Sequence, residues 1–153
     1  MIIWRFVATF FYLGKLPFVP GSWGSLGALL LWLLLPVTFS VHLSVIIILF
    51  VLGVYSSSRM AQYLDDHDAS EVVIDEVVGM GISLFMLPHN FWLYLLSFIL
   101  FRVFDILKPS FIYRIQNLSG GWGIMLDDVL AGLLTFTIVK GITLILGTPV
   151  SSL

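Results

Sequence analysis

Two pairs of adjacent acidic residues lie in strongly apolar surroundings. The segment VVIDEVVG holds Asp75 and Glu76 between valines, and GGWGIMLDDVLAG holds Asp127 and Asp128 just before an apolar run. Carboxylates in such surroundings are costly unless they are paired, hydrogen-bonded or bound to a cation. Hard oxygen ligands of this kind suit Mg²⁺, which proteins hold with one or two carboxylates together with water and substrate phosphate. The four residues are therefore predicted metal ligands.

A third polar segment, FRVFDILKPS, spaces Arg102, Asp105 and Lys108 three residues apart. On a helix these side chains form a ragged polar stripe, and the following proline favours the end of the helix there. Arginine binds phosphate oxygens through a bidentate fork, and lysine binds them as a point charge. We therefore predict contact with a phosphate. Two alternatives are open: the cations mark the membrane interface, or Arg102 or Arg59 forms a structural ion pair with the first acidic pair.

A turn rich in proline and glycine, PFVPGSWGS, comes early in the chain. Its prolines and glycines predict that no regular helix begins before about Ser25, which leaves backbone N–H groups free to face an anion. The hydroxyls of Ser22 and Ser25 add donors. We predict a substrate-binding turn here, with Gly24 in it and with Gly121 in the second glycine-rich segment. The alternative is a simple turn with a serine N-cap that opens a transmembrane helix.

Together these residues predict metal-assisted phosphate chemistry at a membrane surface. In this hypothesis the cation binds the phosphate oxygens and activates a water, while Arg102 and Lys108 offset the charge that builds on the oxygens. The alternative is an aspartyl-phosphate route with Asp105 or Asp127 as the nucleophile. The chain has no cysteine. Its histidines fit solvated or capping positions better than catalytic ones: His42, His67 and His89.

The elements that must position these residues are predicted to be membrane helices. Hydrophobic residues make up 59% of the chain and charged residues 10%, and the mean hydropathy is +1.08. These values exceed what a soluble core of this size needs and indicate an integral membrane protein. A net charge of −2 gives no indication of nucleic-acid binding. The predicted fold class is an all-α, multihelical membrane bundle with helical hairpins and an interfacial polar site, in one domain over residues 1–153.

Long uncharged stretches locate the predicted helices. A spanning helix needs about 20 apolar residues, so residues 24–57 are predicted to form a helical hairpin broken near Pro36, and residues 129–147 a last helix. Lys140 in that last helix is expected to reach toward the far interface. The start of the chain, MIIWRFVATFFYLG, is predicted to be a short helix at the bilayer rather than a removable signal peptide.

The stretch 77–101 sets a condition on the site. If it crossed the membrane once, about 30 Å of hydrocarbon would separate Glu76 from Arg102, and the two could not contact one phosphate. Pro88 and its neighbours can break the stretch into two arms. We therefore predict that residues 77–101 return to the side where they began, as a partly re-entrant pair of short helices.

Four blocks of the sequence resemble the phosphatidylglycerophosphatase A family of bacterial membrane phosphatases. They occur in the family's order and cover most of the chain: PGSWGS at 20–25, VVIDEVVG at 72–79, FRVFDILKP at 101–109 and GGWGIMLDDVLAG at 120–132. The resemblance implies an all-helical, Mg²⁺-dependent phosphatase that converts phosphatidylglycerophosphate in the membrane to phosphatidylglycerol and phosphate. It places the family's charged motif residues on Asp75, Glu76, Arg102, Asp105, Lys108, Asp127 and Asp128, with Asp68 as a further addition.

The charge distribution indicates which side of the membrane holds the site. Lysines and arginines flank the apolar segments, which favours the cytoplasmic side for their loops, and the resemblance implies the same in a multi-pass protein of the bacterial inner membrane. Two other classes are open. A small ion-coupled transporter would also keep carboxylates beside helices, but near the bilayer midplane. A structural membrane subunit would give no reason for glycine turns to accompany the acids.

Overall fold

The computed structural model describes residues 2–64, 70–109, 112 and 120–145, and the described part is helical throughout, without a strand. The N-terminal region holds a short helix, as predicted for the start of the chain, and then one turn of 3-10 helix. The elements are α1 (Ile2–Ala8), η1 (Leu13–Lys15), α2 (Pro20–Leu34), α3 (Phe39–Leu64), α4 (Ile74–Ser83), α5 (Phe91–Leu107) and α7 (Gly121–Ile145). The predicted all-α fold class is confirmed.

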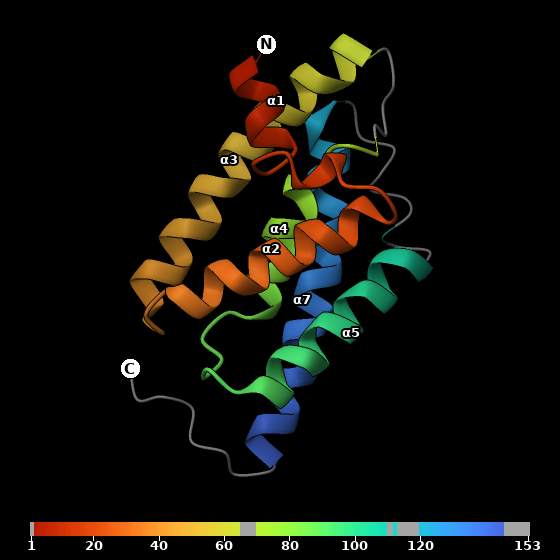
Figure 1. Ribbon diagram of the computed structural model, residues 1–153. Helices are drawn as coiled ribbons and strands as arrows, with labels where there is room; N and C mark the ends of the chain where they lie inside the picture. The colour runs from red at the N-terminus through yellow and green to blue at the C-terminus, as the bar shows by residue number, and fades with distance from the viewer. Residues whose placement is uncertain (1, 65–69, 110–111, 113–119, 146–153) are drawn as a thin grey trace.

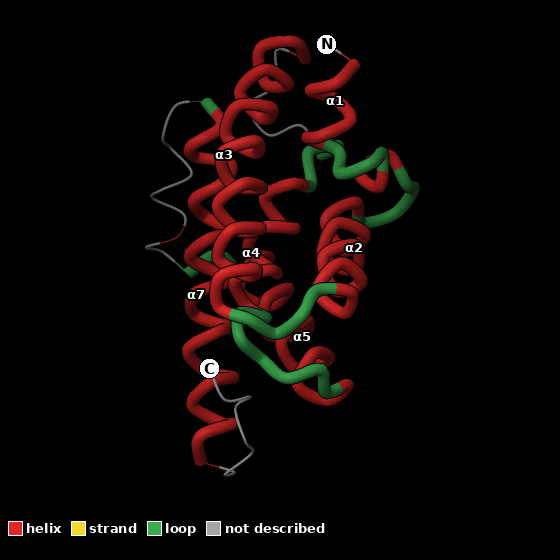
Figure 2. The backbone as a smooth tube through the Cα atoms, turned by 90° about the vertical axis from the view of Figure 1, so that its left-hand side faces the viewer, coloured by secondary structure: helices red, strands yellow, loops and turns green. Residues whose placement is uncertain are grey.

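Helix α4 forms the centre of the molecule, and α7 packs along it (Figure 1). Helices α2, α3 and α5 also contact α4, so the ten residues of α4 are largely enclosed (Figure 2). Val77 and Met80 of α4 are fully buried, as are Phe101 of α5 and Met125 of α7. The shortest helix of the core is thus held by all its neighbours, and the residues at its start are fixed in place.

Two helices are long and apolar enough to cross a bilayer. Helix α3 has 26 residues and α7 has 25, and the most apolar windows of these two helices are only 17% and 33% buried. Large apolar side chains also point outwards, such as Leu34 on α2, 83% exposed, and Ile48 on α3, 57% exposed. An apolar surface of this extent is what lipid covers. The protein is a membrane protein.

The predicted hairpin within residues 24–57 is formed by α2 and α3, with the break at residues 35–38. The expectation that a regular helix begins only at about Ser25 is wrong, because α2 begins at Pro20. A proline at the first helical position loses nothing, since its missing N–H has no partner inside the helix. A side chain at Gly24 would place its Cβ 2.8 Å from that of Val73. The glycine therefore allows close packing inside a helix.

Helix α7 begins at Gly121, ahead of the predicted apolar stretch 129–147. Gly120 has a left-handed φ of 68°, and the N–H of Gly121 donates to the Ser58 hydroxyl of α3 at 2.8 Å. This partner satisfies one of the free N–H groups at the helix start. Asp127 and Asp128 consequently lie inside α7, beyond its first turn.

Residues 77–101 return to the end where they began, as predicted. Helix α4 covers about 15 Å, too short for a bilayer core of about 30 Å, and α5 starts after a loop over residues 84–90. The Asn90 side chain caps α5 by accepting from the N–H groups of Trp92 and Leu93, and His42 Nδ1 accepts from the Met86 N–H at 3.1 Å. The loop is therefore fixed to α5 and to α3.

Candidate functional site

A charged pocket of about 250 Å³ lies where four helices meet. It is formed by the first residues of α2 and α4, the last turn of α5 and the part of α7 that holds the two adjacent aspartates. All seven charged residues that the sequence singled out line it: Asp75, Glu76, Arg102, Asp105, Lys108, Asp127 and Asp128. Segments far apart in the sequence thus converge on one polar cavity.

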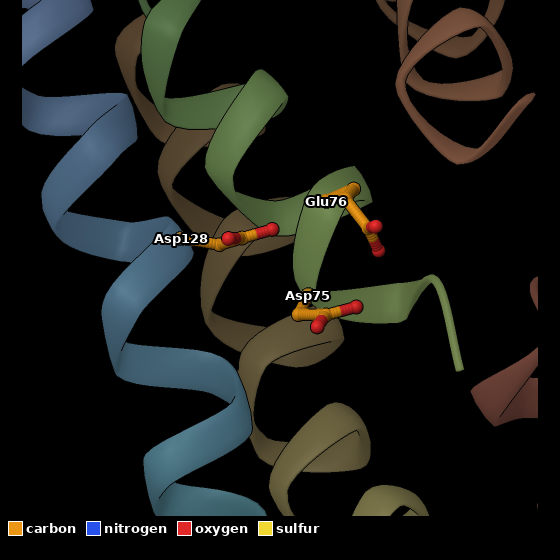
Figure 3. Close-up of side chains that lie close together, drawn as sticks. All are labelled: Asp75, Glu76 and Asp128. Carbon is orange, nitrogen blue, oxygen red and sulfur yellow. The ribbon is translucent and has the colours of Figure 1, made fainter. Parts of the chain in front are cut away.

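Three carboxylates form the acidic group of the charged pocket. Asp75, Glu76 and Asp128 each offer an oxygen, and these oxygens all lie within 4.8 Å of one another. Figure 3 shows the first two at the start of α4 and Asp128 facing them from α7. Burial raises the pKa of the Asp75 carboxyl well above its usual range, and neighbouring Glu76 raises it further. Three acids so close together need a cation to remain charged side by side.

The acidic group has unsatisfied oxygens. Asp75 Oδ1, Glu76 Oε2 and Asp128 Oδ2 are buried and have no hydrogen-bond partner among the described residues. A buried polar atom without a partner is costly, so it indicates a ligand or ion at that point. Oxygen-only donors on a small pocket are the ligand set of a hard divalent cation such as Mg²⁺. The residues present therefore fit a metal.

Two cations complete the pocket. Arg102 Nη1 donates to Asp105 Oδ2 at 2.6 Å and lies 3.9 Å from Glu76 Oε1. Lys108 Nζ donates to Asp127 Oδ2 at 2.7 Å. Burial lowers the pKa of Lys108, but the hydrogen bond and the charges of nearby carboxylates outweigh it, so the net shift is upwards and the ammonium stays charged.

Asp127 differs from the other predicted metal ligands in its surroundings. It is 3% exposed, its Oδ2 accepts from Lys108, and its Oδ1 accepts from the N–H of Asp128. Both oxygens are thus engaged, and Asp127 lies outside the acidic group. Adjacent residues of a helix point about 100° apart, which is why Asp127 and Asp128 face different partners.

The predicted substrate-binding residues do not line the pocket: Ser22, Gly24, Ser25 and Gly121. Ser25 is fully buried and donates its hydroxyl to the Gly21 carbonyl at 2.9 Å. Gly24 and Gly121 are packed against the backbones of neighbouring segments. The prediction assumed an open turn, whereas residues 20–25 are helical and the Ser25 hydroxyl is used within the helix.

Gly21 lines the pocket together with Val19 and Pro20 of this turn, and it was not among the predicted substrate-binding residues. A Cβ at Gly21 would collide with Glu76 Oε1 and lie 2.8 Å from Arg102 Nη1. Only glycine lets α2 approach these side chains so closely. The signal was present in the proline–glycine pair, but its role depends on the position of Glu76, which is distant in the sequence.

Other candidates lie elsewhere. Asp68 and His67 fall outside the described residues. Neither His42 nor His89 lines the charged pocket, and His42 serves as a hydrogen-bond acceptor for the loop after α4.

Residues 6–143 match the family model described as Phosphatidylglycerophosphatase A. The chain belongs to this family. It is 36% identical to phosphatidylglycerophosphatase A of Escherichia coli K12 over 86% of this chain and 78% of that protein. It is 39% identical to phosphatidylglycerophosphatase A of Haemophilus influenzae over 80% of this chain and 78% of that protein. It is also 37% identical to a protein of Bacteroides thetaiotaomicron with the provisional name phosphatidylinositol-3-phosphatase, over 87% of this chain and 89% of that protein. No solved structure matches the chain significantly.

Membership in the phosphatidylglycerophosphatase A family confirms the resemblance seen in the four blocks and makes the protein a phosphatase. The transporter alternative is not favoured, because family and relatives are phosphatases. The charged residues of those blocks line the same pocket.

Proposed function

We propose that this membrane phosphatase removes the terminal phosphate of phosphatidylglycerophosphate to give phosphatidylglycerol, and that it requires Mg²⁺. One observation carries the proposal: two cations line one pocket at the end of apolar helices together with three carboxylates that each have one buried oxygen without a partner among the described residues. Two of the relatives are named for this substrate. A phosphate monoester on a membrane lipid matches both the charge of the pocket and the apolar surface around it.

Asp75, Glu76 and Asp128 would hold the metal, because their oxygens are close together and one buried oxygen of each lacks a partner among the described residues. When bound there, a divalent cation supplies positive charge for the phosphate oxygens and lowers the pKa of a water molecule. Gly21 keeps α2 close to Glu76, and the α4 helix holds the first two acids on adjacent positions of its first turn.

Arg102 and Lys108 contribute the remaining positive charge. Their donors line the pocket and are suited to the oxygens on which charge builds as the phosphoryl group transfers. Asp105 and Asp127 each hold one of these cations through a short hydrogen bond and act as positioning residues.

Hydrolysis forms a bond from a water oxygen to phosphorus and breaks the bond from phosphorus to the terminal glycerol oxygen, which takes up a proton. We favour attack by water over attack by Asp105 or Asp127, because each of these aspartates is engaged with a cation. The stereochemistry at phosphorus, followed with a substrate phosphate made chiral by oxygen isotopes, measures the choice. Inversion supports direct attack by water, whereas retention, or a trapped phosphorylated enzyme, supports the aspartate route.

The decisive assay is phosphate release by the purified protein in lipid–detergent micelles, with Mg²⁺ or with a chelator. We expect release from phosphatidylglycerophosphate to depend on Mg²⁺ and to exceed release from phosphatidic acid and from phosphatidylinositol 3-phosphate. A preference for either of the other lipids would replace the named substrate. No release from any of the three with Mg²⁺ present would refute the proposed reaction.

We further propose a multi-pass protein of the bacterial inner membrane with the pocket on the cytoplasmic side. Arg102 and Lys108 lie in the pocket, whereas Lys140 lies about 18 Å further along α7 from Asp128 and donates to the Met86 carbonyl at 3.4 Å. The bias of positive charge toward the pocket end favours the cytoplasm for that end.

A further inference from the structure

A second, larger cavity lies beside the charged pocket. It has a volume of about 650 Å³ and runs between α2 and α5, with η1 closing one side. Its lining is almost wholly aliphatic and aromatic, and the lining side chains with polar atoms are those of Trp23, His89 and Tyr94. We call it the α2–α5 groove. Its size is within the range of small-molecule sites, which are mostly apolar with a few polar groups.

On α2 the groove continues the charged pocket along one face of the helix. Val19 and Pro20 line the pocket, and Trp23, Leu26 and Leu30 line the groove. Successive spacings of three and four residues keep these side chains on one stripe of the helix. The stripe extends to Leu33, so the groove follows α2 for about 15 Å beyond Trp23.

On α5 the same continuity runs in the opposite chain direction. Leu95 and Phe98 line the groove, and Arg102 and Asp105 line the charged pocket. Spacings of three and four residues again place all four on one face. Helices α2 and α5 lie side by side in both views (Figures 1 and 2). The two helices therefore carry one surface that is charged at the pocket and apolar beyond it.

Trp23 marks the junction between the two cavities. Its indole N–H donates to the Pro17 carbonyl at 3.2 Å, which holds the ring at the end of the groove next to the pocket. The side chain is 40% exposed. A tryptophan with one polar and one apolar edge suits the depth at which a lipid headgroup meets its chains.

We propose that the α2–α5 groove binds one acyl chain of the phospholipid whose phosphate enters the charged pocket. The inference rests on the proposed function and adds to it the site that holds the chain. A phosphate in the pocket belongs to a lipid, and the diacylglycerol part of that lipid must extend from the pocket along an apolar surface. The groove is the apolar cavity that continues the pocket on both of its flanking helices. It makes the length and shape of the chain a determinant of substrate use.

Bulky substitutions in the groove test the proposal. Leu26→Trp and Leu95→Trp fill the groove from its two walls, and Leu34→Trp is the matched control on α2, outside the groove and 83% exposed. The substrates are dioleoyl and dihexanoyl phosphatidylglycerophosphate in the same micelles. We expect kcat/KM for the dioleoyl lipid to fall about tenfold or more in both groove variants, as expected for the loss of about two buried methylene groups. The dihexanoyl lipid should be used within about twofold of wild type.

A labelling experiment measures chain binding without turnover. The probe is phosphatidylglycerophosphate with a diazirine near the end of one oleoyl-length chain, added with a chelator to the wild-type protein. We expect crosslinks within residues 23–33 and 91–98, reduced by unlabelled phosphatidylglycerophosphate and not by phosphatidylcholine with the same chains. Labelling that spreads equally over the outer faces of α3 and α7, or equal competition by phosphatidylcholine, would overturn the proposal.

The two failures are distinguishable. If the wild type releases phosphate normally and the groove variants match Leu34→Trp on both lipids, the groove assignment is wrong and the reaction stands. If the wild type releases no phosphate but the groove is labelled with the expected competition, the reaction is wrong and the groove assignment stands.

Discussion

The three carboxylates of the acidic group are a source of instability that a bound cation would relieve. Asp75, Glu76 and Asp128 keep their oxygens within 4.8 Å of one another, so without a cation they repel each other or must take up protons. We predict that Asp128→Asn lowers phosphatase activity at least about 100-fold. Changing a residue that only supports a metal ligand costs up to about 100-fold, and a direct ligand should cost at least as much. In a chelator the same variant should melt about 2–4 °C above wild type, which corresponds to about 1 kcal/mol.

The matched control is Glu71→Gln. Glu71 pairs with Arg5 at 2.9 Å and is 37% exposed, so its loss should leave activity unchanged. Melting curves with and without Mg²⁺ complete the measurement. Wild type should gain stability on adding Mg²⁺, and Asp128→Asn should gain much less. Equal gains in both proteins would mean that the acidic group holds no metal.

Arg102 is expected to act through the geometry of its guanidinium as well as its charge. Its Nη1 already bonds Asp105 at 2.6 Å, and the remaining donors of the fork are available for a phosphate. Lysine keeps the charge and loses the fork. We predict that Arg102→Lys lowers kcat on the order of 100-fold.

Arg59→Lys is the control for the arginine change, because Arg59 is bonded to the Tyr55 hydroxyl on α3 and does not line the charged pocket. Steady-state kinetics on phosphatidylglycerophosphate should show no change in this variant. An Arg102→Lys enzyme within about twofold of wild type would show that only the charge at this position is used.

The types of the site residues could be predicted from the sequence, and their pairing could not. Charged residues within apolar segments can be recognised from the sequence as site candidates, because burying a charge is costly without a partner. The sequence does not say that Asp128 faces α4 while Asp127 faces Lys108. That division depends on the rotation of α7 about its axis, which long-range packing sets. Gly21 was missed for the same reason, since its neighbours are Glu76 and Arg102.

At the scale of elements, the contact between α4 and α7 decides whether the acidic group forms. Gly79 and Gly132 face each other across it, and a Cβ on Gly79 would lie 2.6 Å from the carbonyl oxygen of Asp128. We predict that Gly79→Ala destabilises the protein by about 1–3 kcal/mol, as overpacking does, and reduces Mg²⁺-dependent activity. Thermal unfolding in detergent and phosphate release measure the two effects.

Gly141→Ala provides a control within α7, since a Cβ there meets nothing within 4 Å. Alanine favours a helix over glycine by about 1 kcal/mol, so this variant should be as stable as wild type or more stable. Similar losses in Gly79→Ala and Gly141→Ala would show that close contact between α4 and α7 is not the cause.

Helix starts were the least predictable part of the elements. Glycines suggested open turns at residues 20–24 and 120–123, yet helices cover residues 20–24 and 121–123. In each case a distant partner supplies the reason: Val73 and Glu76 approach α2, and Ser58 accepts from the first N–H of α7. The helical hairpin and the break near Pro88 were predictable, because proline and the length of apolar stretches act locally.

For the whole molecule, the two long helices and the three shorter helices at the charged pocket have different tasks. Helices α3 and α7 are long enough to cross a bilayer, whereas α2, α4 and α5 each begin or end at the charged pocket. Because α4 and α5 together leave the pocket and return to it, residues 72–109 contribute acids and cations to one site at one end of the molecule.

The sidedness that this arrangement predicts can be measured, because the sequence has no cysteine. Ser70 lines the charged pocket, Pro109 follows the pocket residue Lys108, and Thr38 directly precedes α3, which is long enough to cross a bilayer. Single cysteines at Ser70 and Pro109 should therefore lie on one side of the membrane, and a single cysteine at Thr38 on the other. With an impermeant thiol reagent, we expect Ser70→Cys and Pro109→Cys to react only in inside-out vesicles, and Thr38→Cys only in right-side-out vesicles. Reaction of Ser70→Cys and Pro109→Cys from opposite sides would mean that residues 77–101 cross the bilayer, and the charged pocket could not then assemble.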